Sequence, residues 1–220
     1  MKKIKISLIL NIIIVLLVLL SSIFMFIGFK FMPGETLLEV SKLEMFKFYT
    51  VDSNILMGII SLIFIIYEIK LLKNRIKEIP KKIYILKLIA TSGITLTFLT
   101  TTFFLGPSYG FYAMFNNNNL FFHLIIPVLS IITYIFFEKH KNKYKYAFFG
   151  IIPMFLYSIF YIANVLIHLN NGGLTFKYDF YGFLQGNINN IYIVIPVIYL
   201  MSYIISVLLV FGNKRGALHE

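Results

Sequence analysis

The sequence predicts an all-α, polytopic integral membrane protein with six transmembrane helices, and three observations support this. Of the 220 residues, 59% are hydrophobic, against roughly half in soluble domains. Six segments each hold about 20 predominantly apolar residues, the length that crosses a bilayer. Positive charge alternates along the connections between these segments. Because no polar region stands apart, we predict a single transmembrane domain over residues 1–220.

The predicted spans follow the apolar runs in order. The first run is too long for a signal peptide and no small-residue cleavage site follows it, so we expect a retained helix. The spans cover roughly residues 4–29, 48–69, 83–105, 118–137, 146–169 and 191–211.

Lysine and arginine give the orientation. They gather before the first span, in the second and fourth connections and after the last span, and such an excess marks the cytoplasmic side. Both termini are therefore expected in the cytoplasm, and the composition suggests a bacterial cytoplasmic membrane. The same distribution accounts for the net charge of +11, so no nucleic-acid partner is expected. Glu68 and Glu138 stand beside lysines at the inner ends of their spans, where we expect interfacial ion pairs.

The absence of cysteine and the spacing of the histidines restrict the chemistry. Without cysteine the chain has no disulfide, no thiolate nucleophile and no Cys-based metal site. No His-x-x-x-His or His-x-x-x-Asp spacing occurs, so neither a metal nor another cofactor is predicted.

A polar run opens the second span. Thr50, Asp52 and Asn54 lie in the first turns of a segment that must cross lipid, where polar groups are costly and rare unless they pair or function. At about 3.6 residues per turn, Thr50 and Asn54 share a helix face and Asp52 points away from both. The alternative is that Thr50 or Asp52 caps the helix.

His123 lies about one turn inside the fourth span, four residues before a proline. Pro127 cannot donate to the carbonyl of residue 123, so that carbonyl is freed and the helix is expected to bend. A titratable ring beside a freed carbonyl suits a site lined by other helices or by water. A neutral histidine that is hydrogen-bonded between helices is the alternative.

The fifth span carries a polar and aromatic stripe. Pro153, Tyr157, Tyr161, Asn164 and His168 fall on one narrow helix face. We predict that its outer half forms a cavity wall at the depth of Thr50 and His123, with helix packing as the alternative.

These groups suggest acyl transfer. A hydroxyl nucleophile needs a nearby base, and Thr50 with His123 would supply the pair. Asp52, Asn54 or Asn164 would orient the imidazole or stabilise an oxyanion.

Three segments resemble the androgen-induced protein family, which includes the androgen-dependent TFPI-regulating protein. Residues 46–56 (FKFYTVDSNIL) resemble the Phe-Thr-x-x-Ser-Asn-Leu signature of its bacterial relatives, and residues 120–127 (LFFHLIIP) are similar to its His-x-x-x-Pro helix. Pro153, Tyr157 and residues 178–184 (YDFYGFL) resemble its fifth helix and the aromatic loop after it.

Characterised animal members of that family are membrane hydrolases that cleave fatty acid esters of hydroxy fatty acids with a threonine and a histidine. The resemblance therefore implies that Thr50 is the nucleophile and His123 the base, and that the substrate is a lipid ester entering from the bilayer.

Two other classes of function stay open. One is a non-enzymatic substrate-binding or transport subunit for a small hydrophobic ligand, although residues 4–29 lack the alanine pattern with which such subunits dock a partner. The other is a structural or signalling membrane protein in which the polar groups only fix helix packing.

Overall fold

In the part of the chain that the structure describes, six helices are long and apolar enough to span a membrane. The computed structural model describes residues 2–34, 40–140, 142–169 and 177–218, and within these ranges it holds no β-strand. Each observed span overlaps the predicted one, so the prediction of an all-α polytopic membrane protein is confirmed. The spans are Lys2–Ile27, Tyr49–Leu72, Lys81–Tyr109, Asn118–Phe137, Tyr144–Ile167 and Ile188–Arg215.

Several spans are built from more than one helical segment. The first two are α1 (Lys2–Ile27) and α2 (Tyr49–Leu72), with the short segment η1 (Lys42–Lys47) before α2. The third joins α3 (Lys81–Thr100), the π-helical turn η2 (Thr101–Leu105) and α4 (Gly106–Tyr109), and α5 (Phe111–Met114) follows it. The fourth joins α6 (Asn118–Leu120), the π-helical turns η3 (Phe121–Ile125) and η4 (Thr133–Phe137), and α7 (Ile126–Ile132) between them. The last two join η5 (Tyr144–Ile151) to α8 (Ile152–Ile167) and η6 (Ile188–Asn190) to α9 (Ile191–Leu218).

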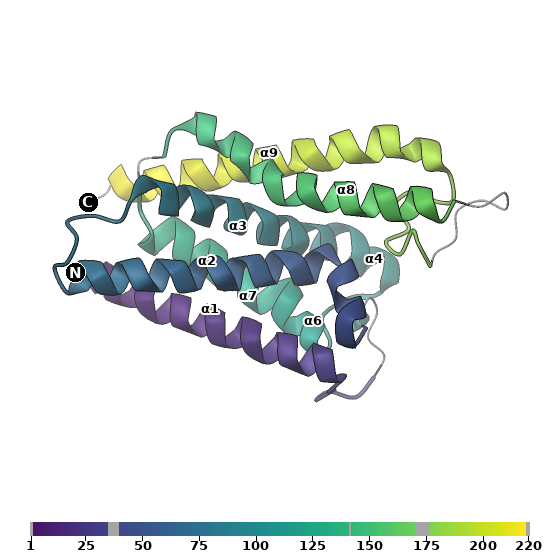
Figure 1. The fold of residues 1–220 in the computed structure, drawn as a ribbon, viewed down its shortest axis with the longest axis horizontal. Coiled ribbons are helices and arrows are strands. Elements are labelled where there is room, and N and C mark those ends of the chain that lie inside the picture. Colours follow the sequence, from purple (N-terminus) through teal and green to yellow (C-terminus); the bar gives the residue numbers. More distant parts are fainter. Residues whose placement is uncertain (1, 35–39, 141, 170–176, 219–220) are drawn as a thin grey trace.

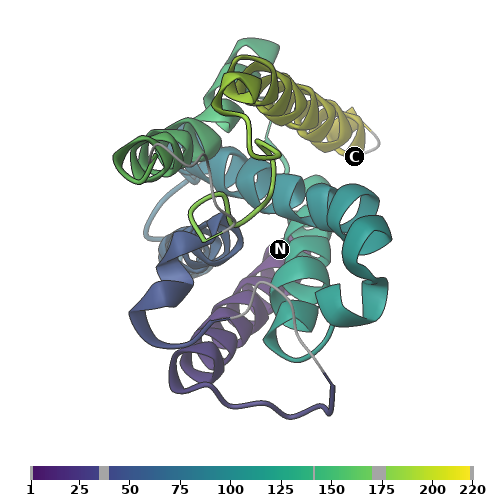
Figure 2. The same cartoon turned by 90° about the vertical axis from the view of Figure 1, so that its right-hand side faces the viewer.

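The third span packs between the others. α3 contacts α2 and α7 on one side and α8 and α9 on the other, as the end-on view in Figure 2 shows. Its apolar stretch is 61% buried, against 28% in the first and last spans. Small side chains permit this close approach, since Ala90, Thr91, Ser92 and Gly93 follow one another and are all buried.

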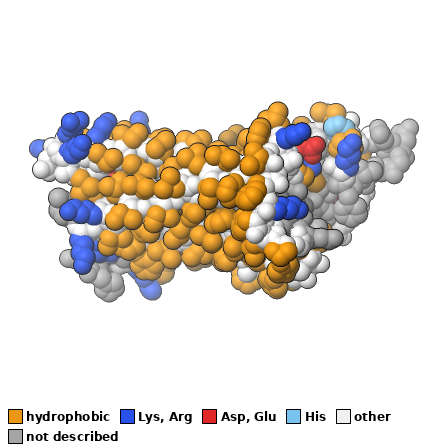
Figure 3. Space-filling model, turned by 90° about the horizontal axis from the view of Figure 1, so that it is seen from below, with side chains coloured by type: hydrophobic (Ala, Val, Ile, Leu, Met, Phe, Trp, Pro, Cys, Tyr) orange, Lys and Arg blue, Asp and Glu red, His pale blue; other side chains and the backbone are white. Residues whose placement is uncertain are grey.

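The two ends of the bundle differ in charge. Both chain termini lie at one end (Figure 1), and Lys and Arg side chains gather there, while apolar side chains cover the middle of the molecule (Figure 3). We call this lysine-rich end the inner end and the opposite one the outer end. An apolar girdle between polar ends is the surface that a bilayer requires.

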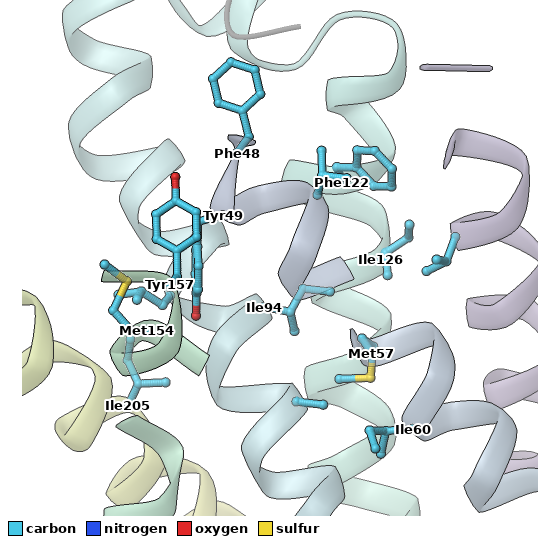
Figure 4. Close-up of a cluster of buried hydrophobic side chains, with 14 of the residues drawn as sticks. Phe48, Tyr49, Met57, Ile60, Ile94, Phe122, Ile126, Met154, Tyr157 and Ile205 are labelled. Carbon is cyan, nitrogen blue, oxygen red and sulfur yellow. The ribbon is translucent and has the colours of Figure 1, made fainter. Parts of the chain in front are cut away.

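The packed interior of the outer half surrounds the start of α2. Figure 4 shows Phe48 and Tyr49 beside Tyr157 of α8, with Ile94 of α3 and Phe122 of η3 close by. The rings of Tyr49 and Tyr157 meet edge to face with centroids 5.2 Å apart, an arrangement that aromatic pairs favour. This packing fixes the first turn of α2, which carries the polar run.

Candidate functional site

The first backbone N–H of α2 is satisfied from a distant loop. Phe48 precedes the helix, and no side chain of this segment makes a capping hydrogen bond. Instead the Tyr49 N–H donates to the phenol oxygen of Tyr181 at 2.8 Å. The side-chain cap considered for Thr50 or Asp52 is therefore replaced by the phenol of Tyr181, while Asp52 does lie in the first turn of α2, where a negative charge is favoured.

Tyr181 also reaches Thr50. The two side chains line the same cavity, and the phenol oxygen accepts from the backbone N–H of Tyr49, the residue before Thr50. Burial raises the pKa of Tyr181 to about 12, so the phenol stays protonated near neutral pH. It can act there as a neutral hydrogen-bond donor but not as a base.

The loop that carries Tyr181 is fastened to α8. The buried carboxylate of Asp179 accepts hydrogen bonds from the Tyr161 hydroxyl and, at 3.1 Å, from the Leu184 N–H. Asn164 donates to the Tyr178 carbonyl at 3.2 Å, and the His168 ring stacks on Tyr178 at 3.8 Å between centroids. Tyr161, Asn164 and His168 thus anchor the loop that brings Tyr181 to Thr50.

Thr50 lines an apolar cavity of about 250 Å³ in the outer half of the bundle. We call it the threonine cavity, because the polar residues described in its lining are threonines and tyrosines. Phe104 and Val197 of its lining are 57% and 49% exposed, so the cavity borders the apolar surface that a bilayer would cover. The lining residues are Tyr49, Thr50, Leu96, Thr97, Thr100, Thr101, Phe104, Leu105, Met154, Tyr157, Tyr181, Phe183, Ile193, Val194, Val197, Ile198 and Met201.

Tyr157 is the member of the predicted stripe that reaches this cavity. It is buried between α2 and the loop, and its hydroxyl donates to the Lys47 carbonyl at 2.6 Å. The ring therefore forms a fixed wall next to Thr50.

Asn54 joins the start of α2 to the fourth span. Its side-chain N–H₂ donates to the Thr50 carbonyl at 2.8 Å and to the Phe122 carbonyl at 3.0 Å. Asn54 is fully buried, and its side-chain oxygen has no hydrogen-bond partner among the described residues. One amide thus holds the backbone of Thr50 beside the residue that precedes His123.

His123 is buried in a defined tautomer. The ring Nδ1 lies 2.6 Å from the Met114 carbonyl, and because a carbonyl only accepts, Nδ1 must carry the proton. Nε2 of the neutral ring then holds the lone pair, which is the form that a general base needs. The helix was expected to bend before Pro127, and at this place the structure has the π-helical turn Phe121–Ile125.

The two proposed catalytic side chains have different neighbours. Thr50 lines one cavity with Tyr181, whereas the His123 ring bonds the Met114 carbonyl and meets the Phe115 ring edge-on at 6.3 Å between centroids. Among the described residues, the lining of the threonine cavity does not include His123. The connection between them is the side-chain amide of Asn54, which donates to the backbone carbonyls of Thr50 and Phe122.

Asp52 faces another side of α2, as its helical position predicts. It is half-buried and lines a surface groove of about 400 Å³ together with Phe46, Pro153 and Phe160. It therefore does not share the threonine cavity. In the described ranges, no group of three His, Cys, Asp or Glu side chains is placed to hold a metal ion.

A second polar cluster, at the inner end, escaped the sequence reasoning. Glu68 and Glu138 are 1% and 2% exposed, so the expectation of interfacial pairs with neighbouring lysines is wrong. Glu138 pairs instead with Lys87 of α3 at 3.2 Å, and Asn11 of α1 binds both carboxylates. The sequence did contain an indication of this cluster, because Asn11 and Lys87 are polar residues inside otherwise apolar spans.

The chain matches no family model, no curated protein and no solved structure in the comparisons made. Any assignment of function must therefore come from the site itself. The fold and the site define a six-helix integral membrane protein with a hydroxyl-lined apolar cavity in its outer half.

Proposed function

We propose that this chain is a lipid-ester hydrolase of a bacterial cytoplasmic membrane, with Thr50 as nucleophile and His123 as general base. The observation that carries the proposal is the place of Thr50 in the lining of an apolar cavity that also includes the exposed side chains of Phe104 and Val197. A fatty-acyl ester would enter such a cavity from the lipid, with its chain against the apolar side chains and its carbonyl near the hydroxyls.

The chemistry follows from the groups around Thr50. The Thr50 oxygen attacks the ester carbonyl carbon while Nε2 of His123 takes the hydroxyl proton. The carbon–oxygen bond to the alcohol then breaks, and the imidazolium returns the proton to the departing alkoxide. Water, deprotonated by His123, attacks the acyl-threonine, and a fatty acid leaves with Thr50 restored. The protonated phenol of Tyr181 would donate to the carbonyl oxygen as negative charge develops on it.

In this proposal, the Thr50 and His123 side chains come into contact in the substrate complex. Catalytic hydrogen bonds are often long in the absence of substrate and tighten in the complex. Asn54 supports this, because its bridge keeps the two backbone segments adjacent. The Nδ1–Met114 hydrogen bond supports it too, since it fixes the tautomer that leaves Nε2 basic.

A second candidate is a subunit that binds a lipid without cleaving it. The observation in its favour is that the His123 ring bonds the Met114 carbonyl and that, among the described residues, the lining of the cavity that holds Thr50 does not include His123. Such a protein would use the threonine cavity for the same class of apolar ligand.

One experiment separates the two. The purified full chain in lipid vesicles is given a panel of lipid esters, including fatty acid esters of hydroxy fatty acids, and fatty acid release is measured. Thr50→Ala and His123→Ala should each lower turnover at least about 100-fold if they supply the nucleophile and base. Thr100→Ala, which alters another hydroxyl of the same cavity, serves as the control and should retain most of the activity.

Equal turnover by the wild type, Thr50→Ala and His123→Ala would overturn the proposed mechanism. An ester that co-purifies or binds intact, with no release of acid by any variant, would favour the binding subunit.

A further inference from the structure

The inner end of the bundle holds three charged side chains that are shielded from solvent. Lys87 is 0% exposed, Glu68 1% and Glu138 2%. Glu68 and Lys87 belong to the second and third spans and Glu138 directly follows the fourth, and Asn11 of α1, also fully buried, bonds all three. Charges in such a position are costly unless they are paired and hydrogen-bonded.

The Lys87 ammonium uses all three of its donors within the cluster. It donates to the Asn11 side-chain oxygen at 2.5 Å and to the Ser61 hydroxyl at 2.8 Å, and it pairs with Glu138 Oε1 at 3.2 Å. Lysine has three N–H groups and no more. Glu138 is therefore the counter-charge of Lys87, and no N–H of Lys87 remains for Glu68.

Among the described residues, the hydrogen-bond partner of Glu68 is a neutral side chain. Its Oε2 accepts from the Asn11 side chain at 3.4 Å. Asn11 donates at the shorter distance of 2.8 Å to Glu138 Oε1. Of the two carboxyl groups, Glu138 is thus the one that forms an ion pair within the described residues.

Both carboxyl groups border a cavity of about 470 Å³ at the inner end. Glu138 Oε2 is buried and has no hydrogen-bond partner among the described residues, which leaves an acceptor for water or a proton at the cavity floor. The charged and titratable groups around the two carboxyl groups are Lys2 and Lys3 of α1, Tyr84 and Lys87 of α3, and Lys139 after η4. Lys2 and Lys3 are exposed, so solvent screens their charges more than that of Lys87.

We propose that this cluster is a proton-binding site, reached from the inner end, in which Glu68 and Glu138 together hold one exchangeable proton that offsets the second carboxylate charge. With one proton bound, the buried groups are Lys87⁺, Glu138⁻ and neutral Glu68, and their net charge is zero. Release of the proton leaves one uncompensated negative charge where α1, α2, α3 and the end of η4 meet. This site is separate from the threonine cavity and does not depend on ester hydrolysis.

The proposal predicts how many protons each variant binds in the cluster. The number of neutral carboxyl groups should be the number that brings the net charge of the buried side chains to zero. The wild type should hold one neutral carboxyl group in the cluster. Glu68→Gln and Glu138→Gln should each hold none, since one carboxylate then balances Lys87. Lys87→Met should hold two, since nothing balances either carboxylate.

Infrared spectroscopy of the full chain in phosphatidylcholine vesicles counts these groups, because the C=O stretch of a carboxylic acid is separate from the bands of a carboxylate. At neutral pH, the carboxylic acid band should be lost in both glutamine variants and should double in Lys87→Met. It should shift in D₂O, since the cavity gives the proton a path to solvent. Glu44→Gln, whose side chain is 74% exposed, is the matched control and should leave the band unchanged.

Persistence of the full band in both glutamine variants would overturn the proposal, as would a Lys87→Met spectrum identical to that of the wild type. If the glutamine variants do not fold, the wild type alone still decides. Raising the pH must convert one carboxylic acid band into a carboxylate band, and absence of that band at neutral pH contradicts the site.

Discussion

The side-chain amide of Asn54 donates to the Phe122 carbonyl at 3.0 Å, across 68 residues of sequence. The same N–H₂ group donates to the Thr50 carbonyl at 2.8 Å. The bond to Phe122 has a structural cause, because the π-helical turn Phe121–Ile125 ahead of Pro127 changes the carbonyl pairing of that helix. A buried donor on α2 thereby connects the second and fourth spans at the depth of the proposed site.

Replacing Asn54 should therefore destabilise the protein. Asn54→Ala leaves the Phe122 carbonyl without this donor, and an unsatisfied buried group costs about 1–3 kcal/mol. We expect a loss of that size in the free energy of unfolding, measured in detergent by circular dichroism. Asn189→Ala, at an exposed position, is the control and should change stability by less than about 0.5 kcal/mol. Equal stability of the two variants would show that the bridge contributes nothing.

Tyr181→Phe tests the contact between the loop and α2. The substitution keeps the ring, which stacks on Phe183 at 5.0 Å between centroids, but it removes the oxygen that accepts from the Tyr49 N–H. We expect a loss of roughly 0.5–1.5 kcal/mol in the free energy of unfolding, the net value of one hydrogen bond. Tyr192→Phe, at a side chain that is 78% exposed, is the matched control. A Tyr181→Phe variant as stable as Tyr192→Phe would contradict a stabilising role for this bond.

The spans were predictable from sequence because hydropathy over about 20 residues is a local property. The site was predictable only in part. Helical periodicity separates Thr50 from Asp52, and it puts Tyr157 on the face that reaches Thr50. Periodicity within one helix cannot show that Tyr181 folds back onto α2, since that contact depends on how a loop packs.

The largest error concerned Glu68 and Glu138. Long charged side chains near span ends are expected to extend to the membrane surface, and neighbouring lysines offered partners there. The actual partner, Lys87, lies on another span, and only the packing of α3 against α2 and the end of η4 brings the three together. A lysine about two turns inside an apolar span was the warning, since such a residue in lipid needs a partner.

His140 gives the protein a predictable response to acid. Burial, together with the charge of Lys81, lowers the pKa of His140 below 6.5. As the pH falls through about 6.5, the unfolded chain therefore takes up a proton before the folded protein does, and stability falls. The slope has an upper limit of about 1.4 kcal/mol per pH unit, and the partial exposure of the ring reduces it.

The measurement is the free energy of unfolding between about pH 7.5 and 5.5, on either side of the ordinary histidine pKa. His140→Gln should lose less stability over this range than the wild type, because glutamine does not titrate. Parallel curves for the two proteins would contradict the prediction.

The ion pair of Lys87 and Glu138 should show strong coupling in a double-mutant cycle. Lys87→Met removes the counter-charge of Glu138, so this carboxyl group must also bind a proton when the chain folds at neutral pH, and loss of one partner of a buried pair costs about 3–5 kcal/mol. The loss should shrink at lower pH, because the carboxyl groups of the unfolded chain are then also protonated and folding no longer requires the uptake of a proton. The double variant Lys87→Met/Glu138→Gln leaves Glu68, which can bind a proton, as the only carboxyl group in the cluster. It should therefore recover most of the stability at neutral pH, whereas losses that simply add would show that the two side chains do not interact.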